Sequence, residues 1–293
     1  MSLYAIYNGK LVREEQIYIS PNNRSFRYGD GCFETMKVVN GNLLLASFHF
    51  KRLFNSLNVL KFIVPAQITP AVLEEQVLQL VLKNGQQQFS RVRFVAFRGS
   101  GGLYENDGNA IHYIIQSFTG NPSTNIYNKE GLSLEFYKEF KKATDTFSAL
   151  KTNNFLGYSM GAIWAKENGL DDCIISNAFN RIADATIANI FIVSDGIIKT
   201  PGITEGCVNG VMRRYLLNCF STESIPFAEQ QLTSEDILSA SEIFLTNANY
   251  GIRWVKRVGP VEYLNSVSAQ LYYKFIAPLF NPSTFLIVLL LLA

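Results

Sequence analysis

One lysine in this sequence stands where an amine could act as a nucleophile. Lys151 follows the small and apolar run 147–150 and precedes the polar turn 152–154, which would place its amine at a sheet edge facing a cleft. Partial burial disfavours the ammonium and lowers the pKa of the amine, and a neutral amine is what a Schiff base with an aldehyde cofactor requires. Because most lysines are solvated surface groups, the neighbouring motifs must decide its role.

Two further segments could bind a phosphate group. Gly210 lies directly in front of an amphipathic helix, where the backbone N–H groups of Val211 and Met212 could hold an anion. Arg52 could form bidentate bonds to phosphate. Taken singly, a plain helix start and a solvated helix face remain open as alternatives.

The composition is that of an ordinary globular chain. The 293 residues are 48% hydrophobic, and 26 Lys+Arg against 24 Asp+Glu leave a formal charge of +2. This balance excludes a disordered chain and argues against a nucleic-acid partner, which would call for a basic stripe.

The cysteines and histidines argue against a metal site. The four cysteines are scattered, and only His49 and His112 are present, so neither a disulfide framework nor a metal centre is expected. The N-terminus has no basic cluster followed by an apolar stretch, so we expect a cytoplasmic protein. The apolar run 285–293 is too short to span a bilayer as a helix, which takes roughly 20 residues, and we expect it to be buried or covered in an oligomer.

Strands and helices must position these groups, and the hydrophobic periodicity predicts them. In the first part, strands are predicted at 3–7, 35–39, 43–45, 91–97 and 111–116, with helices at 49–60 and 70–82. In the second part, strands are predicted at 132–136, 173–176, 187–193 and 242–245, with helices at 160–168 and after Gly210. The turn-forming stretch 119–124 favours a linker between them.

These elements predict a mixed α+β protein of two domains. We expect a small α/β N-terminal domain at 1–118, an interdomain linker at 119–128 and a larger, barrel-like C-terminal domain at 129–293.

Seven segments in order resemble the motifs of the class IV aminotransferases, which are pyridoxal-phosphate enzymes of fold type IV. The resemblance runs from about residue 3 to about residue 280. The segments are Phe26-Arg-Tyr-Gly-Asp-Gly-Cys-Phe-Glu-Thr35, His49-x-x-Arg52-Leu53-x-x-Ser56, Lys151-Thr-Asn-Asn-Phe155, Ala188-Asn189-Ile-Phe191, Thr200-Pro201, Asn209-Gly210-Val-Met-Arg213 and Phe244-Leu-Thr-Asn-Ala248.

The resemblance implies pyridoxal 5'-phosphate as cofactor and a homodimer with its active site near the subunit interface. Lys151 matches the family's Schiff-base lysine, which also moves the substrate proton. For the rest of the cofactor site, the resemblance implies the following residues: Arg52, Gly210, Val211, Met212, Asn247 and Ala248 around the phosphate, and Asn189 on the Asn-Ile-Phe strand.

At two positions near the expected cofactor site, the sequence departs from the residue that is usual in the family. Asp184 stands five residues before Asn189, where the family usually has a glutamate facing the pyridine nitrogen. Asp184 still provides a carboxylate, so the pyridine ring can still serve as electron sink. Either the cofactor lies closer to the strand, or a water bridges the carboxylate and the ring nitrogen. Phe155 stands where many relatives have a tyrosine, so a hydroxyl near the cofactor is missing.

Substrate choice is expected to lie in Tyr28, Glu34, Arg98 and the loop 99–104. Arg98 has the chemistry for a substrate carboxylate. In the motifs at 33–35, 98–102 and 208–213, the residues are closer to those of the aminodeoxychorismate lyases than to those of the branched-chain aminotransferases.

Three activities follow from the resemblance. The first is 4-amino-4-deoxychorismate lyase, which releases pyruvate and leaves 4-aminobenzoate for folate synthesis. The second is a branched-chain or D-amino-acid aminotransferase, which passes the amino group to a 2-oxo acid. The third, prompted by Asp184 and Phe155, is a protein that binds the cofactor without catalysis.

Overall fold

The computed structural model describes residues 3–104 and 108–280, and the chain divides into two compact units. The first unit comprises Met1–Pro122 with Leu150–Phe155, and the second comprises Ser123–Ala149 with Leu156–Ala293. The predicted domain limits differ from this division in one respect, because the segment carrying Lys151 groups with the first unit. The Phe33 N–H donates to the Lys151 carbonyl at 2.9 Å, and Cys32 forms an isolated antiparallel bridge with Thr152.

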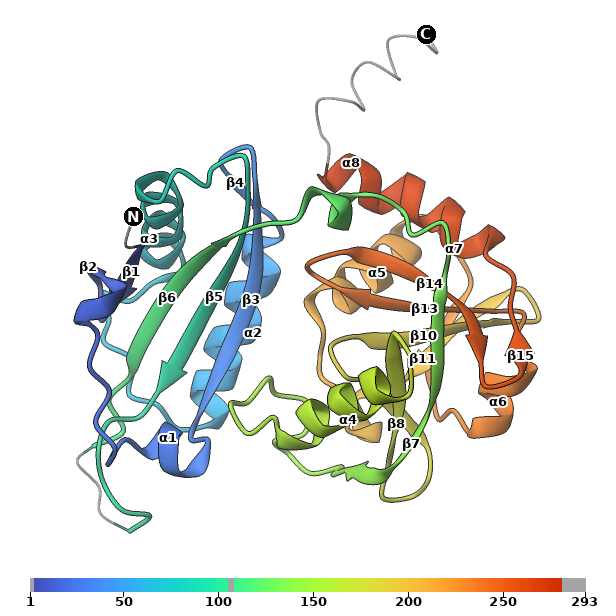
Figure 1. The fold of residues 1–293 in the computed structure, drawn as a ribbon, viewed down its shortest axis with the longest axis horizontal. Helices are drawn as coiled ribbons and strands as arrows, with labels where there is room; N and C mark the ends of the chain where they lie inside the picture. The colour runs from blue at the N-terminus through green and yellow to red at the C-terminus, as the bar shows by residue number, and fades with distance from the viewer. Residues whose placement is uncertain (1–2, 105–107, 281–293) are drawn as a thin grey trace, which may run out of the picture. The chain divides into compact units, whose positions relative to one another are not determined.

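The first unit is an antiparallel sheet covered on one face by two helices (Figure 1). The strand order is β2-β1-β6-β5-β3-β4. Its strands are β1 (Tyr4–Tyr7), β2 (Lys10–Arg13), β3 (Gly31–Val39), β4 (Asn42–Leu43), β5 (Phe89–Phe97) and β6 (His112–Thr119), and its helices are α1 (Arg24–Tyr28), α2 (Ala46–Val59) and α3 (Pro70–Lys83).

The helices α2 and α3 form where the periodicity predicts them. Thr69 caps α3 by accepting from the N–H of Val72 at 3.3 Å, and Pro70 occupies the first turn. The buried stripe of α3 runs through Leu73, Val77, Leu80 and Val81, and the partly buried Leu78 packs against the same core. Both helices pack on the sheet face that carries Met36, Val38, Val92 and Phe94.

The second unit is built on a larger mixed sheet that curls on itself (Figure 1). The order is β12-β11-β10-β13-β14-β7-β8-β9, with β15 paired to β14, and β9 also contacts β10 and β11. Its strands are β7 (Leu132–Lys142), β8 (Asp172–Asn177), β9 (Ile182–Ala185), β10 (Asn189–Ser194), β11 (Ile197–Pro201), β12 (Phe227–Gln230), β13 (Glu242–Asn247), β14 (Gly251–Val258) and β15 (Val261–Glu262).

Helices cover the second sheet on its outer side and close its end. They are α4 (Leu156–Glu167), α5 (Val211–Thr222), α6 (Ser234–Ser239), α7 (Ser266–Leu271) and α8 (Ala277–Phe280). A π-turn η4 (Tyr272–Ile276) joins α7 to α8, and 3₁₀ turns lie at η1 (Glu14–Gln16), η2 (Pro122–Asn125) and η3 (Ile203–Glu205). The apolar core lies within the curl, and the predicted combination of a small α/β part with a larger barrel-like part is confirmed.

The apolar tail 285–293, expected to be buried or covered, lies outside the described residues. Among the helices that the structure describes, none is both long and apolar enough to cross a bilayer.

Candidate active site

A buried ion cluster joins β3 to α2 in the first unit. Glu34 accepts from Arg52 through Nε at 2.7 Å and Nη2 at 2.6 Å, and it pairs with His49 Nδ1 at 2.7 Å. Burial by itself would raise the pKa of Glu34, but the Arg52 guanidinium and His49 outweigh it and lower that pKa to about 2. Glu34 is therefore an ionised group inside the core of this unit.

This geometry limits how Glu34 and Arg52 could contact a ligand, and the role of Glu34 toward the substrate stays a prediction. Glu34 was expected to face the substrate, but its side chain is buried and both its carboxylate oxygens are held by α2. Arg52 directs two of its five N–H groups to Glu34, so a phosphate would have to use the other side of the guanidinium. Its role toward phosphate stays a prediction.

The stability contributed by Glu34 should depend on pH. Because folding lowers its pKa from 4.5 to about 2, this stabilisation is present above pH 4.5 and is lost as pH falls toward 2. The difference in unfolding free energy between wild type and Glu34→Gln should shrink by roughly 2 kcal/mol between pH 6 and pH 3, measured by urea denaturation. The exposed Glu223→Gln should show a small, flat difference, and an equally flat Glu34→Gln difference would disprove the assignment.

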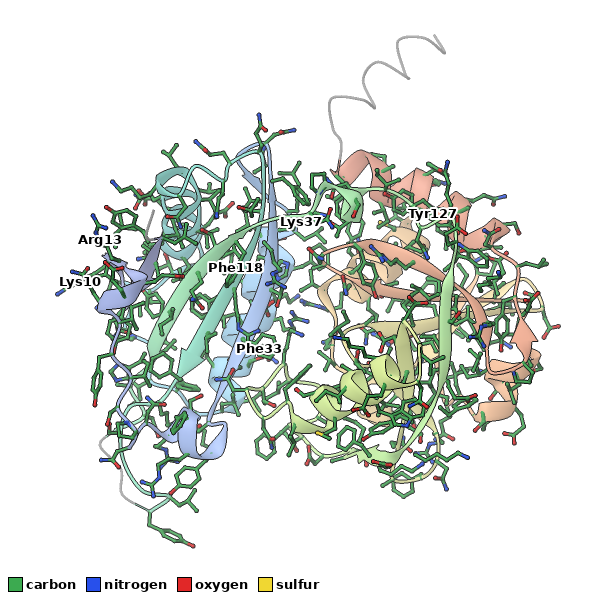
Figure 2. All side chains as sticks on the ribbon, viewed as in Figure 1. Lys10, Arg13, Phe33, Lys37, Phe118 and Tyr127 are labelled. Atoms are coloured by element: carbon green, nitrogen blue, oxygen red, sulfur yellow. The ribbon has the colours of Figure 1, made fainter. Side chains whose placement is uncertain are left out.

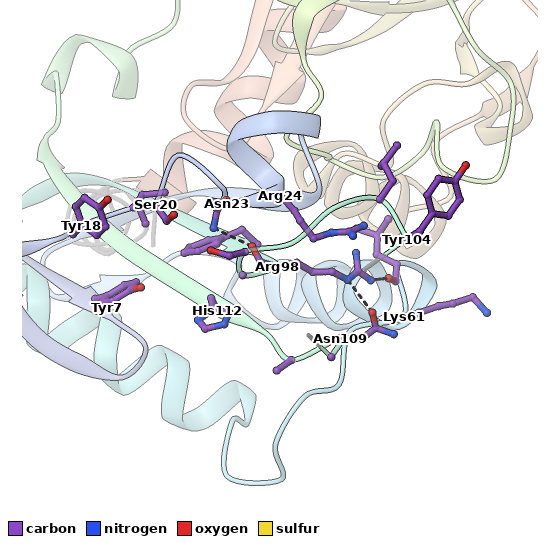
Figure 3. A pocket seen from close by; sticks show the side chains of 18 residues that line it. Tyr7, Tyr18, Ser20, Asn23, Arg24, Lys61, Arg98, Tyr104, Asn109 and His112 are labelled. Atoms are coloured by element: carbon purple, nitrogen blue, oxygen red, sulfur yellow. Dashed lines mark hydrogen bonds between the residues drawn. The ribbon is translucent and has the colours of Figure 1, made fainter. Parts of the chain in front are cut away.

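Arg98 is also held by protein groups, at the wall of a cavity in the first unit. The cavity has a volume of about 570 Å³, and Arg24, Lys61 and His112 also line it (Figure 3). Arg98 forms an ion pair with Asp30, donates to the carbonyl of Leu60 and donates from Nε to Asn109 Oδ1 at 3.2 Å. The guanidinium predicted to bind a substrate carboxylate thus has several protein partners in the fold, and its role toward the substrate stays a prediction.

Part of the loop 99–104 lines this cavity, whereas Tyr28 is not among the lining residues. Tyr28 is partly exposed at the end of α1, and the Arg27 guanidinium lies 5.2 Å from its ring centroid. Gly99, Leu103 and Tyr104 line the cavity wall. Their role in substrate choice stays a prediction.

Lys151 lies on the sheet face of the first unit that α2 and α3 leave open. Its Nζ is 4.4 Å from the ring centroid of Phe33 and 5.1 Å from that of Phe155. Phe33 and Lys37 belong to the same face of β3, because strand side chains alternate (Figure 2). The cross-strand partners on β5 place Arg93 opposite Thr35 and Arg91 opposite Lys37.

We call Lys37, Arg91, Arg93 and Lys151 the basic face. Each cation contacts an aromatic ring of the first unit: Lys37 contacts Phe89, Arg91 contacts Phe118, and Arg93 and Lys151 both contact Phe33. The positions of β3, β5 and β6 that point to this side include no acidic residue. Like charges gathered in this way favour an anionic ligand.

Arg93 is a candidate that the sequence analysis missed. Its guanidinium lies 4.2 Å from the Phe33 centroid, over the same ring as Lys151. Burial, and then the charge of Arg91, lower the pKa of Arg93. The Arg-Val-Arg spacing on a strand was the available signal, since period 2 puts both arginines on one face.

In the second unit, Asp184 is the centre of a buried hydrogen-bond network. Its Oδ2 accepts from the Tyr158 hydroxyl at 2.8 Å and from the Val208 N–H at 2.9 Å, and its Oδ1 accepts from Asn189 Nδ2 at 3.0 Å. A carboxylate has about four acceptor positions, so one position at Oδ1 remains for a further donor. That donor could be a protonated ring nitrogen.

Asn189 links this network to the start of α5. Its amide nitrogen also donates to the Val208 carbonyl at 2.7 Å, and a Cβ added to Gly210 would overlap Asn189 Oδ1. The side chain of Asn189 therefore orients Asp184 and the loop before α5, whereas the resemblance had placed it among the cofactor contacts. The N–H of Asn209 donates to the Ala149 carbonyl at 2.9 Å, which ties the chain two residues before Lys151 to this loop.

The start of α5 fits a phosphate group. Gly210 is the N-cap and offers no side chain to the first amides, including those of Val211 and Met212. Thr246 lies directly opposite Asn189 in the β10–β13 pair, and its buried hydroxyl makes no hydrogen bond to the described residues. An anion at this position would give that hydroxyl an acceptor, so the residues present suit pyridoxal phosphate.

Asn247 is the last residue of β13, and Ala248 begins the turn that follows it. Asn247 Oδ1 accepts from the N–H groups of Asn249 and Tyr250 at 2.9 and 3.1 Å, so the side chain stabilises the turn itself. Thr246 is the better phosphate candidate, and its unpaired buried hydroxyl could not be recognised from sequence.

Gly210→Ala should destabilise the protein by about 1–3 kcal/mol, because the new methyl group must displace the Asn189 amide. Gly202→Ala is the matched control, since Gly202 has nearly the same backbone angles and a Cβ there meets only Thr204 Oγ1 at 3.6 Å. Urea denaturation of both variants measures the difference. Equal unfolding free energies would show that the Gly210 contact is not tight.

The chain is similar to known proteins of one family. The family model described as "Amino-transferase class IV" matches residues 31–258. The chain belongs to the class IV aminotransferase family. The chain is 26% identical over 243 residues to a putative branched-chain-amino-acid aminotransferase of Methanocaldococcus jannaschii, covering 82% of each chain.

Members of the class IV aminotransferase family with different activities resemble it to the same degree. The aminodeoxychorismate lyase of Vibrio harveyi is 26% identical over 249 residues, covering 84% of this chain and 90% of the relative. The crystal structure of a branched-chain aminotransferase from Thermoproteus uzoniensis, with norvaline, superposes with a TM-score of 0.88 at 21% identity, covering 97% of this chain and 96% of that one. The protein is thus a class IV aminotransferase-like enzyme with the fold type IV architecture, and family membership implies pyridoxal phosphate as its cofactor.

Proposed function

We propose that this protein is a lyase that acts on 4-amino-4-deoxychorismate. The observation that carries the proposal is the basic face, where Arg91 and Arg93 are exposed and no acidic residue lies among the neighbouring strand positions. The substrate is a ring with two carboxylates, which suits several cations set among phenylalanine rings. Valine, with one carboxylate and an aliphatic side chain, would use this face poorly.

Several residues of the chain would each have a separate role in this reaction. The start of α5 and the Thr246 hydroxyl would bind the phosphate, and the Asp184 carboxylate would hold a proton at the ring nitrogen. Pyridoxal phosphate, when bound, supplies an electron-withdrawing ring that stabilises negative charge on the substrate carbon bearing the amine.

Lys151 would remove the proton from that substrate carbon through its Nζ. Arg93, over the same Phe33 ring, is placed to orient a substrate carboxylate relative to the lysine amine. In the lyase, the electron pair left on that carbon would break the neighbouring carbon–oxygen bond, so the enol of pyruvate would leave with the proton taken by Lys151 and an aromatic product would remain.

The test is an assay of the cofactor-supplemented protein with aminodeoxychorismate and no added 2-oxo acid. Release of pyruvate and 4-aminobenzoate supports the proposal, and Arg93→Gln should raise KM, whereas Lys83→Gln on the outside of α3 should not. Amino-group exchange between valine or D-alanine and 2-oxoglutarate, without pyruvate release, would overturn it in favour of an aminotransferase. Cofactor binding without either reaction would mean a non-catalytic protein.

A further inference from the structure

A chain of hydrogen bonds runs from a buried lysine to Asp184. Lys142 Nζ donates to the Tyr158 hydroxyl oxygen at 2.7 Å, and that hydroxyl donates to Asp184 Oδ2 at 2.8 Å. The three side chains come from β7, α4 and β9, and their exposed fractions are 8%, 5% and 2%. Each donor in the chain points toward the carboxylate, so the hydrogen bonds strengthen one another.

Two glycines bring Tyr158 into this position. A Cβ at Gly157 would overlap the ring of Phe140 on β7, and a Cβ at Gly161 would lie 3.1 Å from Cys173 Sγ on β8. Because these glycines are four residues apart on α4, they lie on one face and allow the helix to approach the sheet closely. The Tyr158 ring then packs edge-on against Phe140, with centroids 6.0 Å apart.

The charges around Asp184 are strongly coupled. Burial raises the pKa of Asp184, and the Lys142 ammonium, the Val208 N–H, the Tyr158 hydroxyl and the more distant charge of Arg213 oppose this rise. Burial also lowers the pKa of Lys142, which the charge of Asp184 opposes.

The remaining titratable neighbours are neutral donors. The pKa of Tyr158 lies well above its usual value, first because of burial, and burial raises the pKa of the nearby Cys207 thiol to about 12. Among the groups that oppose the rise in the pKa of Asp184, Lys142 has the largest effect, and the Tyr158 hydroxyl is hydrogen-bonded to both side chains.

We propose that Lys142 and Tyr158 are positioning residues that keep Asp184 ionised and hold its Oδ2, so that Oδ1 is presented to the ring nitrogen of the cofactor. This inference rests on the proposed function for its purpose. The side chain of aspartate is shorter than that of glutamate, and the chain from β7 through α4 fixes where its oxygens lie.

The test is a pH titration of Asp184 in the apo-protein, monitored by ¹³C NMR of the carboxyl carbons of labelled aspartate. The Asp184 signal is assigned by its absence in Asp184→Asn. Tyr158→Phe should raise the Asp184 midpoint by about one pH unit or more, the equivalent of one charge-assisted hydrogen bond. Lys142→Met should raise it at least as far, and Lys142→Arg should restore it. Lys141→Met is the matched control, because Lys141 is exposed and donates to Ser176 and Asn180 instead.

An unchanged midpoint in folded Tyr158→Phe and Lys142→Met would overturn the inference. The phenylalanine variant keeps the ring packing on Phe140, and thermal unfolding verifies that both variants fold. In the loaded enzyme, Tyr158→Phe should lower kcat with little change in KM, since the lost hydroxyl is hydrogen-bonded to Lys142 and Asp184. Absence of a cofactor absorbance band in wild type would defeat the proposed function but leave the apo titration result standing.

Discussion

Lys151→Ala should abolish the visible absorbance of bound cofactor, near 410–420 nm as a rough expectation for a lysine-bound pyridoxal, and lower kcat by a factor of about 10²–10⁴ or more. The amine is lost both as the covalent attachment point and as the group that moves the substrate proton. The absorbance spectrum of the cofactor-supplemented variant and its steady-state rate measure the two losses.

Lys151→Arg separates charge from nucleophilicity. Arginine can place a cation over the Phe33 and Phe155 rings as Lys151 does, but it offers no amine for covalent attachment. We expect it to be as inactive as the alanine variant. Lys166→Ala, on the exposed side of α4, should keep both the band and the rate. A visible band that persists in Lys151→Ala would show that another amine holds the cofactor.

Asp184→Asn should lower kcat by about 100-fold while cofactor binding survives. The amide keeps the shape of the carboxylate but not its charge, so the proton at the ring nitrogen loses its counter-charge where negative charge develops. The groups that we propose for phosphate binding are the start of α5 and the Thr246 hydroxyl, which this substitution leaves in place. Cofactor stoichiometry by absorbance and steady-state kinetics measure the two effects separately.

Asp172→Asn is the control for burial. Asp172 is a buried carboxylate on the neighbouring strand β8, where it accepts from the Thr186 N–H at 3.0 Å and its hydroxyl at 2.7 Å. Its loss should reduce stability without a comparable loss of kcat. Equal rates in Asp184→Asn and wild type would show that the ring-nitrogen assignment is wrong.

The sequence predicted those elements whose periodicity is regular. Helix α3 and strand β5 have long amphipathic patterns and appear within one or two residues of their predicted ends. Strand β14 was missed because a register shift between Val255 and Arg257 interrupts its alternation. Strand β9 was missed because it is only four residues long and carries the charged Asp184.

The sequence motifs predicted which segments carry candidate site residues, but not which side chains contact one another. Arg98 and Asp30 are 68 residues apart in sequence, and Lys142 reaches Asp184 only through Tyr158 on another element. Such contacts depend on how strands and helices pack, which periodicity does not report. The predicted helix start near residue 160 also placed Tyr158 outside the helix, because Gly157 in its first turn is typical of a loop.

The segment Leu150–Phe155 affects the order in which this chain can fold during synthesis. It completes the first unit, yet Ser123–Ala149 of the second unit must be made before it. N-terminal domains usually fold first as the ribosome proceeds, but here the β3 edge that receives residues 151–153 must wait for them. A nascent chain truncated before residue 150 would expose that backbone edge, and no single cut in the polypeptide can release either unit whole.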